Sequence, residues 1–219
     1  MLGDRMPARV LALRLIPRVD AGLRRQLKLD DSAQSLGLIT CDSDDVGYTA
    51  LDEATKKAAV SVCYAQSMYA GAANANTALA GEFLGILAGE TPAAVESGLA
   101  AAKRTIEQDA CFFSASDDDS VVYYAHCISR TGTYLSKANG IPVGSPLAYL
   151  IAPPLESIYA LDKALKAAQV TVAAFYGPPS PTNVGGALLT GSQSSCQAAC
   201  DAFAKAVMEV ARTPVERLG

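Results

Sequence analysis

The sequence predicts an α/β fold in which a small sandwich of strands and helices occurs twice. The first observation is a repeat, because "ALDEATKKAAV" at residues 50–60 and "ALDKALKAAQV" at residues 160–170 agree in seven of eleven positions. The second is that short apolar runs, which are typical of buried strands, flank both copies. The third is that each half ends in a long alanine-rich segment with helical periodicity. We therefore expect two α/β domains of similar fold, residues 1–110 and residues 111–219.

Each half contains four apolar runs that predict strands, and alternating β-branched residues support several of them. In the first half these runs are residues 9–16, 35–40, 60–64 and 83–89. In the second half they are residues 120–129, 146–152, 170–176 and 187–191. A loop rich in small and polar residues separates the third run from the fourth in both halves. The shared order of elements favours a duplicated unit.

The repeated helix should bury one apolar face against the sheet. The residues expected on this face lie at helical spacing: Leu51, Ala54 and Ala58 in the first copy, and Leu161, Leu165 and Ala168 in the second.

The opposite, exposed side of the repeated helix is expected to carry an ion pair. Asp52 and Lys56 are four residues apart, and so are Asp162 and Lys166. Such a pair stabilises an isolated helix by only about 0.3 kcal/mol. Its presence in both copies favours a shared role at the surface.

The alanine-rich helices are predicted at residues 91–108 and 192–212. Thr91 is a suitable N-cap for the first, and Pro92 suits the first helical turn. Ser192 or Ser194 is the corresponding N-cap of the second helix.

Composition and charge exclude several classes of partner. The 219 residues carry 18 basic and 22 acidic side chains, a net charge of −4, without the basic patch that nucleic-acid binding requires. No apolar run is long enough to cross a membrane, and arginines interrupt the apolar segments near the start. Six cysteines without a secretion signal are expected to be reduced thiols. We therefore expect a soluble cytosolic protein that binds neither nucleic acid nor membrane.

The residues that carry chemistry do not form a recognisable catalytic set. His126 is the only histidine, and it lies beside Cys127 on a predicted strand, so the two should point to opposite faces. Cys196 and Cys200 are four apart on a helix, which suits helix packing better than a metal site. The sequence also lacks a phosphate loop and a dinucleotide fingerprint. We expect no enzymatic activity, no cofactor and no metal.

The acidic turn "CDSDDV" at residues 41–46 follows a predicted strand and leaves three interpretations open. A strand that ends in Asp-x-Asp also begins some phosphoryl-transfer enzymes, in which Asp42 or Asp44 would act with Mg²⁺. The turn could instead be a solvated cap of the next helix. A third interpretation is a binding site for a small cation.

The repeated helix resembles the edge helix of bacterial microcompartment shell domains, which has the pattern A-x-D-x-x-x-K-A-A-x-V. The second copy fits this pattern fully, and the first departs from it at Lys57. Longer stretches, including "SLGLITCDSDDVGYTALDEATK" and "LAYLIAPPLESIYALD", resemble the tandem-domain shell proteins of ethanolamine-utilising compartments. The resemblance implies two circularly permuted shell domains and a pseudohexameric homotrimer that packs with other shell proteins. It also implies that Lys56 and Lys166 make edge contacts.

The resemblance further implies a small pore in each subunit that binds a small metabolite such as ethanolamine. Carboxylates would attract an ammonium group, and an aromatic face would add a cation–π contact. The residues implied in this pore are Asp44, Asp45, Glu82, Phe112, Phe113, Thr182 and Asn183.

A second implication is a gated central pore formed by the two loops rich in small residues. Glycines permit the backbone to switch conformation there. The residues implied are Tyr69, Gly71, Asn74, Gly81, Gly177 and Gly185. The predicted function is thus a structural shell protein with gated pores. The alternative is a small-amine binding or sensing protein without a shell role.

Overall fold

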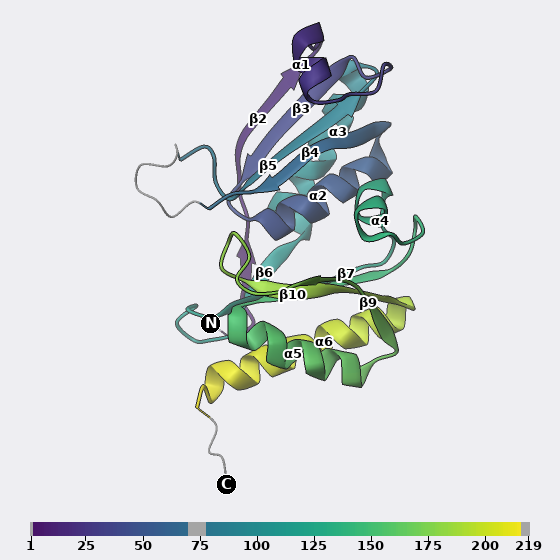
Figure 1. The fold of residues 1–219 in the computed structure, drawn as a ribbon. Coiled ribbons are helices and arrows are strands. Elements are labelled where there is room, and N and C mark those ends of the chain that lie inside the picture. The colour runs from purple at the N-terminus through teal and green to yellow at the C-terminus, as the bar shows by residue number, and fades with distance from the viewer. Residues whose placement is uncertain (1, 70–77, 216–219) are drawn as a thin grey trace. The chain divides into compact units, whose positions relative to one another are not determined.

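The computed structural model describes residues 2–69 and 78–215 and divides the chain into two compact units (Figure 1). The N-terminal unit consists of Pro7–Ala110 together with Thr131–Ala138. The C-terminal unit consists of Met1–Met6, Cys111–Arg130 and Asn139–Gly219. The first residues of the chain thus belong to the C-terminal unit, and the short segment Thr131–Ala138 belongs to the N-terminal unit although it lies in the second half of the sequence.

The N-terminal unit is built on a four-stranded antiparallel sheet in the order β2-β3-β5-β4. Helices α2 and α3 contact each other and the strands of this sheet, and α3 continues into a π-helical turn, η1. The elements are β2 (Val10–Ile16), α1 (Ala21–Gln26), β3 (Ser35–Cys41), α2 (Asp44–Lys57), β4 (Val60–Ser67), β5 (Phe83–Gly89), α3 (Pro92–Arg104), η1 (Thr105–Asp109) and α4 (Thr133–Asn139).

The C-terminal unit is built on a six-stranded sheet in the order β1-β6-β7-β8-β10-β9. Helices α5 and α6 pack together and cover one face of it (Figure 1). Phe203 of α6 and Leu150 and Leu189 of the sheet lie at the centre of this core. The elements are β1 (Arg5–Pro7), β6 (Cys111–Ser114), β7 (Val122–Ile128), β8 (Leu147–Ala152), α5 (Pro154–Ala167), β9 (Val170–Tyr176), β10 (Gly185–Gly191) and α6 (Gln193–Arg212).

The two units repeat one topology. The strand order β2-β3-β5-β4 of the first corresponds to β7-β8-β10-β9 of the second, and in each a helix follows the second and the fourth strand along the chain. The last pair of strands also shifts register in both units, between Val62 and Tyr64 in β4 and between Leu188 and Leu189 in β10. The predicted α/β sandwich that occurs twice is therefore confirmed.

The two long alanine-rich helices, α3 and α6, begin directly after the predicted N-cap residues. The Thr91 side chain accepts a hydrogen bond from the Ala94 backbone N–H at 3.2 Å. Ser192, not Ser194, caps α6 and accepts a bond from the Ser195 backbone N–H at 3.1 Å. The predicted strands are also present, whereas β1, α1, β6 and α4 are short elements that the periodicity did not indicate.

One predicted face of the repeated helix is wrong in the second copy. Leu165 is 37% exposed, and the buried residues of α5 include Ala160, Leu161 and Ala164. Ala160 and Ala164, which are one helical turn apart, pack against the core. Leu165 lies one residue further around the helix and therefore faces away from it. Ala58 and Ala168 are C-cap residues and are only half-buried.

Candidate functional site

Four acidic residues lie in the N-terminal unit where β3 ends and where α2 and β5 begin. We call Asp42, Asp44, Asp45 and Glu82 the acidic junction. The Glu82 backbone N–H donates to the Cys41 carbonyl oxygen at 3.0 Å, which joins the start of β5 to the end of β3. Cys41 and Glu82, which are 41 positions apart in the sequence, therefore meet through the antiparallel pairing of these strands.

Gly81 makes this close approach possible. Its φ of +60° lies in the left-handed region that favours glycine, and a Cβ atom there would collide with the Cys41 carbonyl oxygen. Two residues before Gly81, the Leu79 carbonyl oxygen accepts a hydrogen bond from the Thr40 hydroxyl at 2.6 Å, which holds Leu79 against β3. The backbone thus fixes Glu82 at the acidic junction.

Asp44 and Asp45 form the first turn of α2, where negative charge interacts favourably with the helix dipole. Both are only 6% exposed. The interpretation of this turn as a solvated cap is wrong, because both aspartates are buried and the side chain of Ser43, the N-cap within the turn, makes no capping bond. Asp42 accepts bonds from the Arg9 backbone N–H at 2.6 Å and from Arg9 Nε at 3.0 Å.

Burial and the charges of its acidic neighbours alter the protonation of Glu82. Burial raises the pKa of Glu82 to about 7, and the charges of Asp44 and Asp42 contribute to the rise. Burial likewise raises the pKa of the Cys41 thiol to about 12, so this cysteine is a neutral packing residue. A cation bound beside Glu82 would stabilise its charged form.

Tyr48 lies next to the acidic junction, and the sequence analysis missed it. Its hydroxyl shares a hydrogen bond with the Ser67 hydroxyl at 2.8 Å, and its ring meets Phe83 edge-on at 5.0 Å. Burial raises the pKa of Tyr48, with a contribution from Asp44. The signal was available, because Tyr48 stands one helical turn after Asp44 and so shares its face.

Phe112 and Phe113 lie on β6 of the C-terminal unit, and both are half-buried. Phe113 stacks on Tyr123 with ring centroids 5.9 Å apart and packs against the core of this unit. Phe112 contacts Tyr124 with ring centroids 5.2 Å apart. Neighbouring residues of a strand point to opposite faces, which distinguishes the two rings.

Thr182 and Asn183 lie in a tight turn between β9 and β10. The Asn183 N–H donates to the Ser180 carbonyl oxygen at 3.0 Å, and the Ser180 N–H donates to the Val184 carbonyl oxygen at 2.8 Å. The Thr182 and Ser180 hydroxyls share a hydrogen bond at 3.1 Å. These bonds give the turn a defined backbone.

The remaining residues predicted for a central pore are distributed over both units. Gly177 is exposed just after β9, and Gly185 is buried at the start of β10. Tyr69 is 56% exposed just after β4. Gly71 and Asn74 lie outside the described residues.

The two predicted surface ion pairs differ. Lys166 donates to Asp162 at 2.7 Å, and their side chains are 74% and 56% exposed, as expected for a solvated pair. The expectation for Asp52 is wrong, because its side chain is only 1% exposed. Lys56 lies 3.8 Å from Asp52 and also pairs with Glu53, and its side chain is 20% exposed.

Asp52 is buried because it binds the start of α4. Its two carboxylate oxygens accept bonds from the backbone N–H groups of Gly132 at 2.6 Å and Leu135 at 2.9 Å. Thr55, one turn further along α2, accepts from the Thr133 N–H at 3.1 Å. No sequence signal links residues 80 positions apart, so this role was missed.

The histidine and the cysteines that the sequence singled out pack against neighbouring side chains in the C-terminal unit. His126 and Cys127 lie on β7, and the His126 ring stacks on Tyr124 at 5.6 Å. Cys196 and Cys200 are buried in the core of the C-terminal unit, which confirms their predicted role in helix packing. Within residues 2–69 and 78–215, no three His, Cys, Asp or Glu side chains are placed so that they could hold one metal ion together. No helix in the same part of the chain is long and apolar enough to cross a membrane.

Comparisons with known proteins identify the family. A family model described as the BMC domain matches residues 35–116. The bacterial microcompartment shell protein EutL of Clostridium perfringens is 58% identical over 215 residues, which cover 98% of this chain and 99% of the relative. EutL of Escherichia coli is 52% identical over 208 residues, which cover 95% of each chain.

The chain belongs to the EutL family of bacterial microcompartment shell proteins.

Solved structures agree with this assignment. The crystal structure of EutL from Leptotrichia buccalis matches with a TM-score of 0.96 and 66% identity, covering 99% of this chain and 100% of that one. The fold extends to the shell protein PduB, with a TM-score of 0.73 at 19% identity. EutL proteins are structural tandem-domain shell proteins and not enzymes, which settles the earlier alternative of phosphoryl transfer. As a family member, the chain has its place in the microcompartment shell, within the bacterial cytoplasm.

Proposed function

We propose that three copies of the chain form a pseudohexagonal homotrimer that tiles the shell beside other shell proteins. Its two shell domains are residues 1–110 and 111–219, which contain most of the N-terminal and of the C-terminal unit respectively. The repeated strand order carries this proposal. Two similar units in each chain and a threefold axis give six nearly equivalent units in a closed ring, and such a ring can tile a plane.

The assembly is tested by sedimentation and electron microscopy of the purified chain. We expect a particle with the mass of three chains and flat hexagonal sheets at high concentration. A stable monomer or dimer that forms no sheets would contradict the proposal. It would favour a small-amine binding or sensing protein without a shell role.

Each subunit of this trimer has a small pore for a metabolite such as ethanolamine. The solved relative from Leptotrichia buccalis is named an ethanolamine utilization protein, which suggests the substrate. Support comes from the acidic junction, whose carboxylates suit an ammonium group. The residues assigned to the pore are Asp44, Asp45, Glu82, Phe112, Phe113, Thr182 and Asn183.

Calorimetric titration of ethanolamine tests the small pore. Asp45→Asn keeps the shape of the side chain and removes its charge, so we expect binding to weaken about tenfold. Asp117→Asn removes the same charge from an exposed turn outside either proposed binding site and serves as the control. Binding should also strengthen as the pH rises through about 7, where Glu82 becomes charged. Equal affinity of wild type and Asp45→Asn would contradict the assignment.

The central pore is gated by the loops that carry Tyr69, Gly71, Asn74, Gly81, Gly177 and Gly185. Glycines support this role because they permit backbone conformations closed to other residues. Electron-microscopic reconstructions of the trimer, sorted by the shape of the central region, test it. We expect two arrangements of the loops, and a single arrangement under all ligand conditions would contradict the gate.

A further inference from the structure

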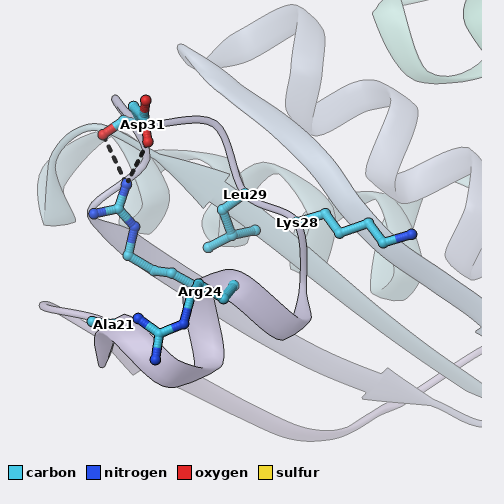
Figure 2. A pocket seen from close by; sticks show the side chains of 6 residues that line it. Ala21, Arg24, Lys28, Leu29 and Asp31 are labelled. Carbon is cyan, nitrogen blue, oxygen red and sulfur yellow. Dashed lines mark hydrogen bonds and ion pairs between the residues drawn. The ribbon is translucent and has the colours of Figure 1, made fainter.

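A cavity of about 220 Å³ lies beside α1 in the N-terminal unit, and none of its lining residues belongs to the acidic junction (Figure 2). We call it the α1 pocket. Its lining combines apolar surface with three basic side chains and one acidic one: Ala21, Arg24, Arg25, Lys28, Leu29 and Asp31. The pocket therefore has a local charge of +2 on a chain whose net charge is −4.

The pocket has a rigid base. Leu27 and Leu29 pack against a buried cluster that includes Leu36 and Ile86 of the sheet. The Asp30 carboxylate accepts bonds from the Ser32 N–H at 2.9 Å and the Ser32 hydroxyl at 2.7 Å, which fix the turn before β3. The wall and floor of the pocket are thus formed before any ligand arrives, which lowers the entropic cost of binding.

Arg24 is held in one position at the edge of the pocket. Its Nη2 atom donates to the carbonyl oxygens of Asp30 at 3.3 Å and Asp31 at 2.9 Å, and lies 3.8 Å from the Asp31 carboxylate. The Arg24 side chain is only 24% exposed, whereas that of Asp31 is fully exposed. Arg24 therefore supplies a fixed positive charge.

Arg25 and Lys28 supply the charge available to a ligand. Among the described residues, neither side chain has a hydrogen-bond or ion-pair partner. Lys28 also has a φ of +51°, which is uncommon for a residue with a side chain. Lys28 directly follows Leu27, the C-cap of α1, where a left-handed residue commonly ends a helix. The Leu29 N–H donates to the Arg24 carbonyl oxygen at 3.1 Å across this helix end, so the backbone of Lys28 is fixed beside the pocket.

The arrangement of the lining favours a ligand with two kinds of surface. Figure 2 shows Arg24 and Lys28 on opposite sides of Leu29, so the cations surround an apolar floor and do not converge on one point. Long basic side chains can cover an apolar body with their methylene groups while their charged ends bind an anion. We propose that the α1 pocket binds a small organic anion, a phosphate or carboxylate attached to an apolar body.

Calorimetric titration of phenyl phosphate into the full-length protein tests this site. Two exposed charge contacts together account for about a tenfold difference in affinity. We therefore expect the double variant Arg25→Gln/Lys28→Gln to bind phenyl phosphate about tenfold more weakly than the wild type. These side chains are at the surface and outside the core, so the variant should fold normally.

The control variant Lys103→Gln/Lys205→Gln loses the same charge from exposed positions on α3 and α6 and should bind like the wild type. Benzyl alcohol, which has the ring without the charge, and inorganic phosphate, which has the charge without the ring, should both bind more weakly. Equal binding of phenyl phosphate by both double variants, or no binding at millimolar concentration, would overturn the proposal.

Discussion

At the scale of single residues, Glu82 links the stability of the fold to pH. Its pKa is about 7 in the folded chain, against an ordinary value of 4.5, mainly because it is partly buried. Between these two values the folded state retains a proton that the unfolded state has lost. The contribution of Glu82 to the free energy of unfolding therefore falls as the pH rises from 4.5 to about 7, and it does not change further above that pH.

Glu82→Gln should remove this loss. Because Glu82 is only half-buried, we expect a modest effect. As the pH rises from about 4.5 to about 8, the free energy of unfolding of the variant should increase relative to that of the wild type by about 1 kcal/mol. Chemical denaturation at a series of pH values, at one protein concentration, measures the difference. Glu90→Gln, at an exposed position, is the control and should show no such gain. Parallel pH profiles for wild type and Glu82→Gln would show that the Glu82 carboxylate ionises normally.

Asp52 and Asp162 occupy the same position of the repeated helix and provide a matched pair of substitutions. Asp52→Asn places an amide group where two backbone N–H groups point, so one donor of Gly132 or Leu135 loses its acceptor. We expect a loss of about 2–4 kcal/mol in the free energy of unfolding. Asp162→Asn breaks only an exposed pair and should cost less than about 0.5 kcal/mol.

Hydrogen exchange separates a local role of Asp52 from a general one. In Asp52→Asn the amides of Gly132 and Leu135 should exchange faster, while those of β8 in the other unit should not change. Similar stabilities of the two variants would mean that the buried bonds to α4 contribute little.

The comparison of these two aspartates shows what the sequence could reveal about the site. The acidic residues of the junction were predicted, because "CDSDDV" follows a clear strand and the resemblance pointed to Glu82. The burial of Asp52 was not predicted, since local periodicity does not record which distant segment packs on a helix. Tertiary contacts such as the bond to Gly132 override the pattern that the two copies share.

At the scale of elements, periodicity predicted the long strands and helices and missed the short ones. β3 and β5 are apolar along most of their length, and α3 has a Thr cap followed by Pro. In contrast, β6 has four residues and α4 has seven, too few to establish a period. Their structure depends on neighbours such as Asp52, which supplies α4 with hydrogen-bond acceptors from outside the helix.

The link between β3 and β5 depends on Gly81. Gly81→Ala would combine a positive φ with a collision against the Cys41 carbonyl oxygen, whereas Gly140 has a similar φ of +63° and open space around it. We expect Gly81→Ala to destabilise the fold by about 2 kcal/mol more than Gly140→Ala. Thermal or chemical denaturation measures this difference. Equal losses would show that the backbone at Gly81 can move away from β3.

At the scale of the whole molecule, duplication explains why a shell protein repeats a helix. The order of strands is the same in both units, although single residues such as Asp52 and Asp162 have diverged in their contacts. Sheet order depends on the pattern of long apolar strands and is therefore retained. A surface residue is free to acquire a new contact in one copy only.

The proposed tiling makes a prediction for the two edge lysines. Lys166 is 74% exposed and has one exposed partner, so its charge is available to a neighbouring trimer. Lys56 is 20% exposed and is held by Asp52 and Glu53. A substitution of Lys166 would therefore remove the proposed contact between trimers without affecting the fold, whereas a substitution of Lys56 would also leave Asp52 without its ion pair.

Lys166→Ala should raise the protein concentration at which sheets form, by about fivefold if each contact contributes about 1 kcal/mol. The mass of the isolated particle in sedimentation should not change. Lys205→Ala removes the same charge from α6 and is the control, because Lys205 is exposed but lies outside the repeated helix. Electron microscopy over a concentration series measures the onset of sheets. If Lys166→Ala and Lys205→Ala form sheets at the same concentration as the wild type, the repeated lysine does not hold trimers together, and the edges must be joined by other residues.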